Sequence, residues 1–409
     1  MIEPKILKGF RDFLPKVAKK RQFVINALKE VFQLYGFEPL ETPALEYEEV
    51  LLGKYGEEGD KLMYRFTDNG KRKVALRYDQ TVPLARVVAQ YQSELPIPFK
   101  RYQIQPVWRA ENTQKGRFRE FLQCDIDTVG SSSSLSDAEI ISCTLDSLKK
   151  LGFKKSQIWV NDRTIFDTLG LKKEEVIILD KLDKIGKEEV IAQWEKNGRK
   201  NAKELFDSLK NSEPTQKLNE IFLILQKQGY KSGEDFVFVP YLARGLDYYT
   251  SIIFESKILD QTSISLLSLA GGGRYDNLIG MFSGKKVPAV GVSFGFDRII
   301  EAMDELKLFP DDLLTTNILI TVFSPDLLEQ SIKIVSELRS ENINTELWLD
   351  PEIKLDKQLK YADQKEIPFA IIIGPDEAAK NVITLRNMKT RDQKEISQEE
   401  LINVLARSL

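Results

Sequence analysis

The spacing of apolar and polar residues predicts helices and strands along most of the chain. Apolar residues recur at helical spacing from residue 17 until Gly36 ends the pattern. A second helical pattern begins at Asp137. Residues 73–79 alternate like a strand, and residues 98–129 predict a strand, a loop and a returning strand. The first part of the chain therefore contains both helices and strands.

Two changes in this pattern divide the chain. Residues 171–233 are rich in Lys and Glu, helical and without strand signals, which predicts an inserted helical module. Strand signals return at Phe236, and the pattern of apolar and polar residues changes again after Pro310. The predicted parts are a first domain in two pieces, residues 1–170 and 234–310, the helical insertion at residues 171–233, and a last domain at residues 316–409.

The last part of the chain alternates strand and helix patterns. Residues 317–323 form a buried-strand run, after which Ser324 and Pro325 supply a helix N-cap and a proline at the first helical position. The pattern continues with a helix to about Arg339, strands at residues 345–349 and 369–374 with a helix between them, and a last helix from Ser397. This alternation predicts a separate α/β domain with a mainly parallel or mixed sheet.

Length and charge limit the class of protein. A chain of 409 residues is long enough for more than one domain, and 42% hydrophobic with 30% charged residues is typical of a globular protein. The net charge of -3 argues against general binding to polyanions, so a nucleic acid would have to meet a local basic surface. No apolar run suits a signal peptide or a membrane span, so we expect a cytoplasmic protein.

The chain contains no histidine and only two cysteines, Cys124 and Cys143. The missing imidazole excludes a histidine base, a Ser-His or Cys-His nucleophile and a histidine-ligated metal. Two cysteines form neither a disulfide framework nor a cysteine-based zinc site, and we expect no metal site formed by the protein. Any chemistry must therefore use Arg, carboxylates, Tyr and Gln, or groups that the substrate supplies.

Residues 242–255 place a cation, an acid and two phenols in a turn before an apolar, β-branched strand. Gly245 would fix the turn that holds the Arg244 guanidinium and the hydroxyls of Tyr248 and Tyr249 at one strand end. Such groups suit a small polar ligand next to a phosphate. A surface turn that leads into a core strand would show the same pattern.

The predicted hairpin carries a second array of polar groups. Period-2 alternation puts Arg109 with Glu111 on one face of its first strand. It puts Phe121 with Gln123 and Asp127 on one face of the second strand. This face would offer a guanidinium, two carboxylates, an amide and an aromatic ring, which can grip a phosphate, stack a base and contact an amino acid. A salt-bridged antiparallel hairpin would show the same alternation.

These segments resemble motifs of the histidyl-tRNA synthetases, a family of class II aminoacyl-tRNA synthetases. The Arg-Gly-Leu-Asp-Tyr-Tyr string at residues 244–249 resembles the family signature, and the hairpin resembles the second class motif. Residues 270–276 and 288–298 resemble the third motif, although the triple glycine within them equally suits a tight turn or a backbone crossing. Further resembling segments are residues 8–15, 76–81, 179–186, 371–374 and 382–388.

The resemblance implies an α+β catalytic domain of the class II type, an antiparallel sheet flanked by helices. It also implies that the helical insertion approaches the tRNA acceptor arm and that the C-terminal α/β domain binds the anticodon. The implied activity is ATP-dependent activation of L-histidine to histidyl-adenylate, with transfer to tRNA(His) and with Mg²⁺ accompanying ATP. The family further suggests a homodimer built through residues 38–50.

Carried over position by position, the resemblance assigns binding residues and a catalytic pair. The histidine ammonium group would meet Asp79, Thr81 and Gln123, and the imidazole nitrogens would meet Asp127, Tyr248 and Tyr249. ATP would be held by Arg109, Glu111, Arg117, Phe121 and Arg298, and the catalytic pair that grips the α-phosphate and the substrate carboxylate would be Arg109 and Arg244. Other members often have Glu where this chain has Asp79 and Asp127, which shortens the reach by a methylene group.

The absence of histidine is compatible with this chemistry, because the substrate's own carboxylate is the nucleophile. Three other functions stay open. A synthetase-like regulatory subunit of histidine biosynthesis, without aminoacylation, is disfavoured by the intact C-terminal part and signature string. A sister class II synthetase for proline, threonine or glycine is disfavoured by Asp127 and by the Tyr248–Tyr249 pair, which suit a ring with two polar nitrogens. A plain nucleic-acid-binding module is disfavoured by the acidic net charge.

Overall fold

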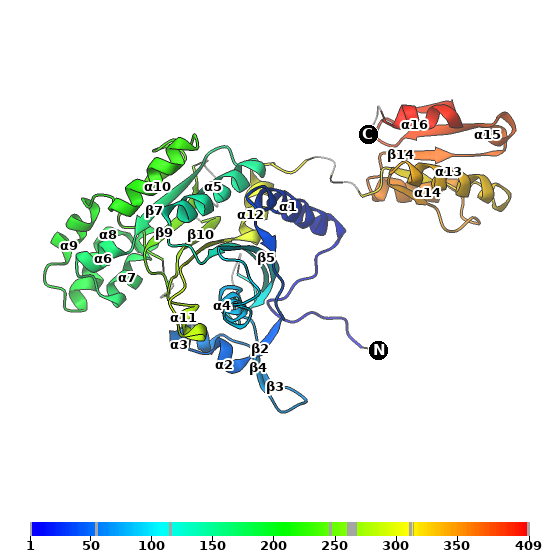
Figure 1. The fold of residues 1–409 in the computed structure, drawn as a ribbon. Helices are drawn as coiled ribbons and strands as arrows, with labels where there is room; N and C mark the ends of the chain where they lie inside the picture. The colour runs from blue at the N-terminus through cyan, green and yellow to red at the C-terminus, as the bar shows by residue number, and fades with distance from the viewer. Residues whose placement is uncertain are drawn as a thin grey trace. The chain divides into compact units, whose positions relative to one another are not determined.

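The computed structural model describes residues 2–53, 56–113, 117–244, 248–259, 268–310, 313 and 315–406 (Figure 1). The chain forms two compact units, Met1–Phe309 and Pro310–Leu409. Over the described ranges, no helix combines the length and the apolar character that crossing a membrane requires.

An eight-stranded sheet with the order β1-β5-β6-β11-β10-β9-β7-β8 organises the first unit. Its strands from β5 to β7 in this order pair antiparallel, and the edge strands β1 and β8 pair parallel with their neighbours. The strands are β1 (Glu38–Pro39), β5 (Phe99–Trp108), β6 (Glu120–Val129), β7 (Ser156–Asp162), β8 (Phe236–Phe238), β9 (Ile252–Ile258), β10 (Ala270–Arg274) and β11 (Ala289–Phe294). The predicted hairpin is confirmed as β5 and β6.

One face of this sheet is covered by helices α1 (Pro15–Leu34), α5 (Ser134–Lys150) and α12 (Phe296–Glu305). Cys124 and Ile126 of β6 point into the apolar core beneath these helices. The neighbouring odd-numbered residues of β6 must point to the opposite face, because side chains alternate along a strand. The helices predicted from residue 17 and from Asp137 are confirmed as α1 and α5.

The triple glycine lies inside strand β10, in the middle of the sheet, and is fully buried. A Cβ atom on Gly272 would lie 2.1 Å from the backbone oxygen of Gly291 on β11. Of the two structures that the sequence left open, the close backbone crossing is therefore the one that forms. Glycine is needed at this position because no side chain fits between the two strands.

A smaller three-stranded sheet precedes the hairpin. It consists of β2 (Leu45–Tyr47), β4 (Lys73–Leu76) and β3 (Arg65–Thr67), with short helices α2 (Glu48–Leu51) and α3 (Gly56–Lys61) beside it. Strand β4 ends at Leu76, three residues earlier than the alternation predicted. Asp79 therefore lies in the turn before helix α4 (Thr81–Gln90), where its Oδ1 accepts the Val82 N–H at 3.1 Å. This turn brings Asp79 and Thr81 to the sheet.

The segment predicted as a helical insertion forms helices throughout. They are α7 (Lys173–Leu179), α8 (Leu182–Lys196), α9 (Ala202–Lys210) and α10 (Gln216–Lys227), preceded by α6 (Thr164–Thr168). Helices α7 to α9 pack around the buried Trp194. Helix α10 differs, because its Leu218, Ile221 and Leu225 belong to the core under α5.

The second unit contains a five-stranded mixed sheet with the order β13-β12-β14-β15-β16. Strand β12 pairs parallel with β13 and β14, whereas β15 pairs antiparallel with β14 and β16. The elements are β12 (Ile318–Ile320), α13 (Leu328–Ser340), β13 (Thr345–Leu347), α14 (Leu355–Gln364), β14 (Phe369–Ile372), α15 (Pro375–Lys380), β15 (Val382–Asn387), β16 (Gln393–Ser397) and α16 (Gln398–Ala406). The predicted mixed α/β domain is confirmed.

The start of helix α13 differs from the prediction. Pro325 opens a short 3-10 turn, Pro325–Leu327, and the α-helix itself begins at Leu328. The Ser324 side chain makes no capping hydrogen bond to this turn. The predicted proline position is right, but the predicted side-chain cap is wrong.

Candidate active site

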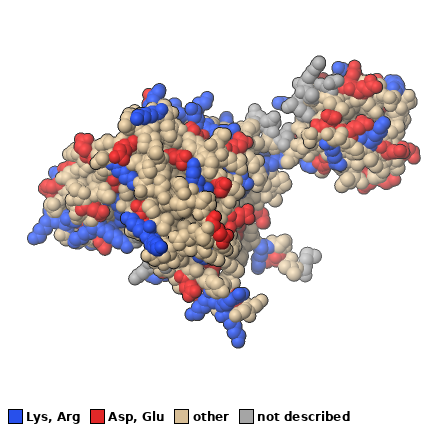
Figure 2. Space-filling view, in the orientation of Figure 1, with Lys and Arg blue, Asp and Glu red and all other residues tan. Residues whose placement is uncertain are grey.

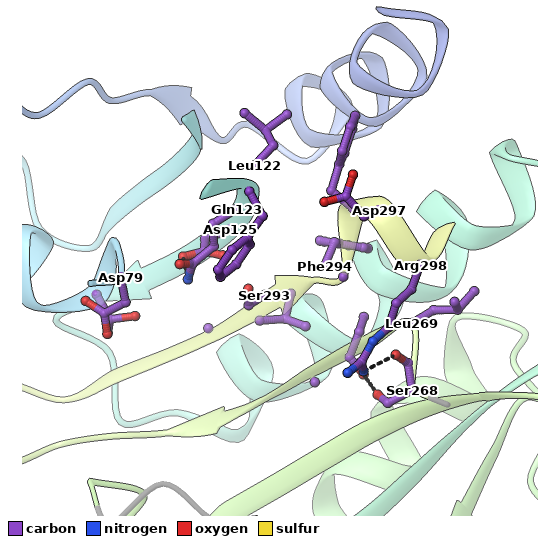
Figure 3. Close-up of a pocket in the computed structure, with 18 of the residues that line it drawn as sticks. Asp79, Leu122, Gln123, Asp125, Ser268, Leu269, Ser293, Phe294, Asp297 and Arg298 are labelled. Carbon is purple, nitrogen blue, oxygen red and sulfur yellow. Dashed lines mark hydrogen bonds between the residues drawn. The ribbon is translucent and has the colours of Figure 1, made fainter. Parts of the chain in front are cut away.

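The face of the sheet opposite α1 and α5 carries a cavity of about 400 Å³. It is bordered by β6, the loop before β6, the start of α4, strands β9 to β11 and the first turn of α12 (Figure 3). Every binding or catalytic residue assigned from the sequence lines this cavity: Asp79, Thr81, Arg109, Glu111, Arg117, Phe121, Gln123, Asp127, Arg244, Tyr248, Tyr249 and Arg298.

Arg109 and Glu111 reach the cavity in a different way from the one predicted. Strand β5 ends at Trp108, so both residues follow the strand, and alternation along it does not place them. The Arg109 guanidinium donates from Nε to the Tyr78 carbonyl oxygen at 3.1 Å. It lies 4.4 Å from the ring centre of Tyr78 and 5.1 Å from that of Phe121. These contacts, rather than a shared strand face, direct it to the cavity.

One end of the cavity is rich in carboxyl groups. Asp125 and Asp127 of β6 are both buried, and both face the fully buried Arg101 of β5. The Arg101 guanidinium lies 2.7 Å from Asp127 and 4.0 Å from Asp125. The Tyr275 hydroxyl donates to the second oxygen of Asp127. Two carboxyls therefore share one guanidinium, and Asp79 adds a third carboxyl to the same lining.

Asp125 is the residue of this end that the sequence reasoning missed. It lies between Gln123 and Asp127 on the same strand face, so the period-2 pattern already contained it. Its Oδ2 accepts the Gln123 amide at 2.8 Å, whereas its Oδ1 and the Gln123 Oε1 accept no hydrogen bond from the part of the chain that the structure describes. Burial raises the pKa of Asp125 to about 7, although Arg101 opposes the shift. Arg101 and Tyr275 were missed because their role depends on pairing between strands.

Arg244 lies over the glycine-rich strand. A Cβ atom on Gly271 would lie 2.4 Å from Arg244 Nη1, so the missing side chain leaves room for the guanidinium. Glu255, which pairs with Gly271 across β9 and β10, places its Oε2 3.8 Å from Nη1. Burial alone would lower the pKa of Arg244, but Tyr249 and Glu255 raise it above its ordinary value. The turn residue Gly245 lies outside the described residues.

The two tyrosines of the signature string form an aromatic wall with Tyr275. The ring centres of Tyr248 and Tyr249 lie 4.9 Å apart, and those of Tyr248 and Tyr275 lie 5.9 Å apart. Burial raises the pKa of all three phenols. Their hydroxyls therefore stay protonated at neutral pH and can donate hydrogen bonds.

The other end of the cavity is rich in guanidinium groups. Arg298 stands on the first turn of α12 and donates to the Ser268 carbonyl oxygen at 3.1 Å (Figure 3). Burial lowers its pKa, and the nearby positive charges of Arg117 and Arg244 lower it further. Arg117 itself lies 3.4 Å from Glu111. Three mutually repelling guanidinium groups around one cavity favour a bound polyanion.

A mainly antiparallel sheet flanked by helices, carrying one cavity with carboxyls at one end and guanidinium groups at the other, is the architecture of a class II aminoacyl-tRNA synthetase. A family model described as "Histidyl-tRNA synthetase" matches residues 9–220 and 170–299, and one described as "Anticodon binding domain" matches residues 317–408. These matches cover most of the chain.

Individual relatives agree with the family models. The histidine–tRNA ligase of Cytophaga hutchinsonii is 39% identical, with 99% of this chain and 100% of the relative covered. That of Treponema denticola is 38% identical, with 100% and 99% covered. The crystal structure of histidyl-tRNA synthetase from Nostoc sp. PCC 7120 superposes with a TM-score of 0.86 at 28% identity and covers 100% of both chains. The chain belongs to the histidyl-tRNA synthetase family.

Proposed function

We propose that this protein activates L-histidine with ATP to histidyl-adenylate and transfers the histidyl group to tRNA(His). Family membership over the full length supports the reaction class. The observation that carries the proposal is the charge separation inside one cavity. An amino acid with a cationic ammonium group and a nucleotide with a polyanionic tail match its two ends.

The carboxyl-rich end suits histidine. Its ammonium group would bind Asp79, Thr81 and Gln123, with Asp125 beside them. Because the buried carboxyls at this end outnumber the single guanidinium of Arg101, this end of the empty cavity carries excess negative charge that a bound cation offsets. The imidazole nitrogens would meet Asp127 and the hydroxyls of Tyr248 and Tyr249, which line the same cavity.

The guanidinium-rich end suits ATP. Phe121 would stack on the adenine, Glu111 and Arg117 would hold the nucleotide, and Arg298 would meet the γ-phosphate, with Mg²⁺ arriving as part of the ATP complex. A carboxylate oxygen of histidine attacks the α-phosphorus, and the bond to the bridging oxygen of pyrophosphate breaks. Arg109 and Arg244 stabilise the charge that develops on the α-phosphate. For the transfer step, a phosphate oxygen of the adenylate is the candidate base.

The remaining parts of the chain would bind tRNA. The second unit matches an anticodon-binding domain model, and we assign anticodon recognition to it. The helical insertion would approach the acceptor arm. Figure 2 shows Lys and Arg side chains gathered along the end of the first unit where α7 and α9 lie, as a phosphate-binding surface requires. By family analogy, residues 38–50 would form the interface of a homodimer.

A regulatory subunit without aminoacylation fits less well. The relatives from Cytophaga hutchinsonii and Treponema denticola, which cover 99% or more of this chain, are named as ligases. The full set of predicted cavity residues is present, and the anticodon-binding model matches through residue 408. Both features are expected of an active synthetase.

Amino-acid-dependent exchange of pyrophosphate into ATP tests the proposal. We expect L-histidine, with Mg²⁺ present, to support exchange at least ~10²-fold faster than any other common amino acid. A site that hydrogen-bonds both ring nitrogens should reject proline and threonine, which leave its polar groups unpaired. Exchange driven by either of these, or by no amino acid, would contradict the assignment.

Removing the second unit should separate the two half-reactions. A chain ending at Phe309 keeps every cavity residue, so its histidine-dependent exchange should stay within about tenfold of the full-length rate. Charging of tRNA(His) should fall much further, because the proposed anticodon contacts are gone. The oligomeric state of the truncated protein is measured in parallel. Equal loss of both activities in a folded protein of unchanged oligomeric state would contradict anticodon binding by this unit.

A further inference from the structure

The N-terminal segment at residues 8–13, part of the stretch 8–15 that resembles the family, packs against the loop that joins β5 to β6. The Gly9 carbonyl oxygen accepts the Arg119 N–H at 2.8 Å. The Arg119 side chain donates to the carbonyl oxygens of Glu111 at 3.1 Å and of Lys8 at 3.4 Å. The backbone of this segment therefore binds Arg119 at the β6 end of the loop, and the Arg119 side chain links that end to Glu111 at the other.

Gly9 is required by this contact for two independent reasons. Its φ of +90° lies in the region that favours glycine. A Cβ atom at this position would also lie 2.7 Å from Arg119 Cγ and 2.9 Å from Thr113 Cγ2. Any side chain at Gly9 would push the loop away from the segment.

Arg11 connects the same loop to helix α12. Its guanidinium carbon lies 3.2 Å from the ring centre of Phe118, and its Nη2 lies 2.9 Å from Asp297 Oδ2. Phe118 and Asp297 both line the cavity, and Asp297 precedes Arg298 on the first turn of α12 (Figure 3). Arg21 of α1 holds the other oxygen of Asp297 at 2.8 Å.

We propose that Gly9 and Arg11 are positioning residues that fix the loop bearing Glu111 and Arg117 relative to Arg298 on α12. The proposal rests on the assignment of these three residues to ATP. The loop has no helix or strand in its described residues between Arg109 and Phe118 apart from one bridge residue, so its position depends on such contacts. The face of the Arg11 guanidinium stacks on the Phe118 ring of the loop, and one edge pairs with the Asp297 carboxylate of α12. One side chain therefore links the two elements that we assign to ATP binding.

This arrangement predicts a selective defect. The carboxyl-rich end of the cavity is built from β6 and the start of α4. The contacts of the N-terminal segment described here go instead to the loop before β6 and to α12. Loosening the loop should therefore weaken ATP binding and leave histidine binding nearly unchanged. A general loss of stability would affect both substrates.

The test compares Arg11→Gln with Lys20→Gln in the full-length protein. Lys20 of α1 forms an ion pair with Asp304 of α12, the helix that Arg11 also contacts through Asp297, and neither Lys20 nor Asp304 lines the cavity. We expect Arg11→Gln to raise the KM for ATP about tenfold in pyrophosphate exchange, with the KM for histidine changed less than about twofold. Lys20→Gln should leave both constants unchanged. Arg11→Lys, which keeps the ion pair with Asp297, should recover part of the loss.

A comparison of single and double variants tests the same contact if Arg11→Gln lowers the amount of folded protein. Phe118→Leu removes the other partner of the stacked pair, and the double variant should be little worse than the worse single variant, because both act through one contact. Equal rises in the KM for ATP and histidine, or additive losses in the double variant, would overturn the proposal. If instead the unaltered protein shows no histidine-dependent exchange, the proposed function itself fails.

Discussion

Replacing Arg244 with alanine should lower the rate of histidine-dependent pyrophosphate exchange at saturating substrates by at least ~10²-fold. The guanidinium is partly buried in the cavity lining and lies over Gly271, whose missing side chain leaves room for it. It is held there by Glu255 and keeps its charge in spite of burial. In the proposed reaction, a fixed cation of this kind would stabilise negative charge developing on the α-phosphate without having to reorganise.

Replacing Arg244 with lysine separates the effect of its positive charge from that of its forked hydrogen-bond geometry. Lysine keeps a positive charge but loses the forked donor arrangement, so Arg244→Lys should fall between the parent and Arg244→Ala. Arg199→Ala is a suitable control, because Arg199 pairs with Glu175 in the helical segment, and neither residue lines the cavity. A defect confined to the KM for ATP would show that Arg244 only binds the ground state, which would remove it from the catalytic pair.

The sequence predicted the elements of this site better than the contacts within it. The helical spacing before Gly36 and the hairpin at residues 98–129 were sufficient to predict α1, β5 and β6, because local periodicity fixes both kinds of element. The same alternation predicted that Gln123 and Asp127 share a face, and both line the cavity. It failed for Arg109 and Glu111 because the strand ends before them.

Contacts between distant strands could not be read from periodicity. Arg101 lies opposite Asp127 only because β5 and β6 pair in one particular register. Tyr275 reaches Asp127 from beyond β10, 148 positions away in the chain. The triple glycine had two local explanations, and the neighbouring strand β11 decided between them. The sequence thus contained the groups of the site, whereas their partners depended on the tertiary structure.

In the proposed histidine site, Asp125 is a buried carboxyl that lowers the stability of the empty protein. Replacing it with asparagine should therefore weaken the reaction with histidine but stabilise the empty protein. In the histidine-dependent reaction, Asp125→Asn should lower kcat/KM for histidine by about 10- to 10³-fold, the range expected when a buried charged contact to a polar ligand is lost. The KM for ATP should change little, because Asp125 lies at the carboxyl-rich end of the cavity. The empty protein, in contrast, should become more stable at pH 8.

The sign of the stability effect follows from the raised pKa of Asp125. In the unfolded chain this carboxyl loses its proton near its ordinary value of 3.8, whereas in the folded, empty protein it keeps the proton up to about pH 7. Between these values the folded state binds more protons, so the free energy of unfolding decreases as the pH rises through this window. Asparagine does not titrate, so the gain in Tm over the parent should be small at pH 5 and larger at pH 8.

Asp162→Asn is the matched control on the same sheet. The Asp162 carboxylate is buried but accepts hydrogen bonds from the Thr215 hydroxyl at 2.8 Å and the Thr164 N–H at 3.1 Å, and it does not line the cavity. Its replacement should lower the Tm and leave the KM for histidine unchanged. Thermal unfolding at pH 5 and pH 8, combined with the kinetics of pyrophosphate exchange, distinguishes a substrate-binding carboxyl from a structural one. If Asp125→Asn binds histidine like the parent, or loses stability at pH 8, the carboxyl is a structural group and the substrate ammonium is held elsewhere.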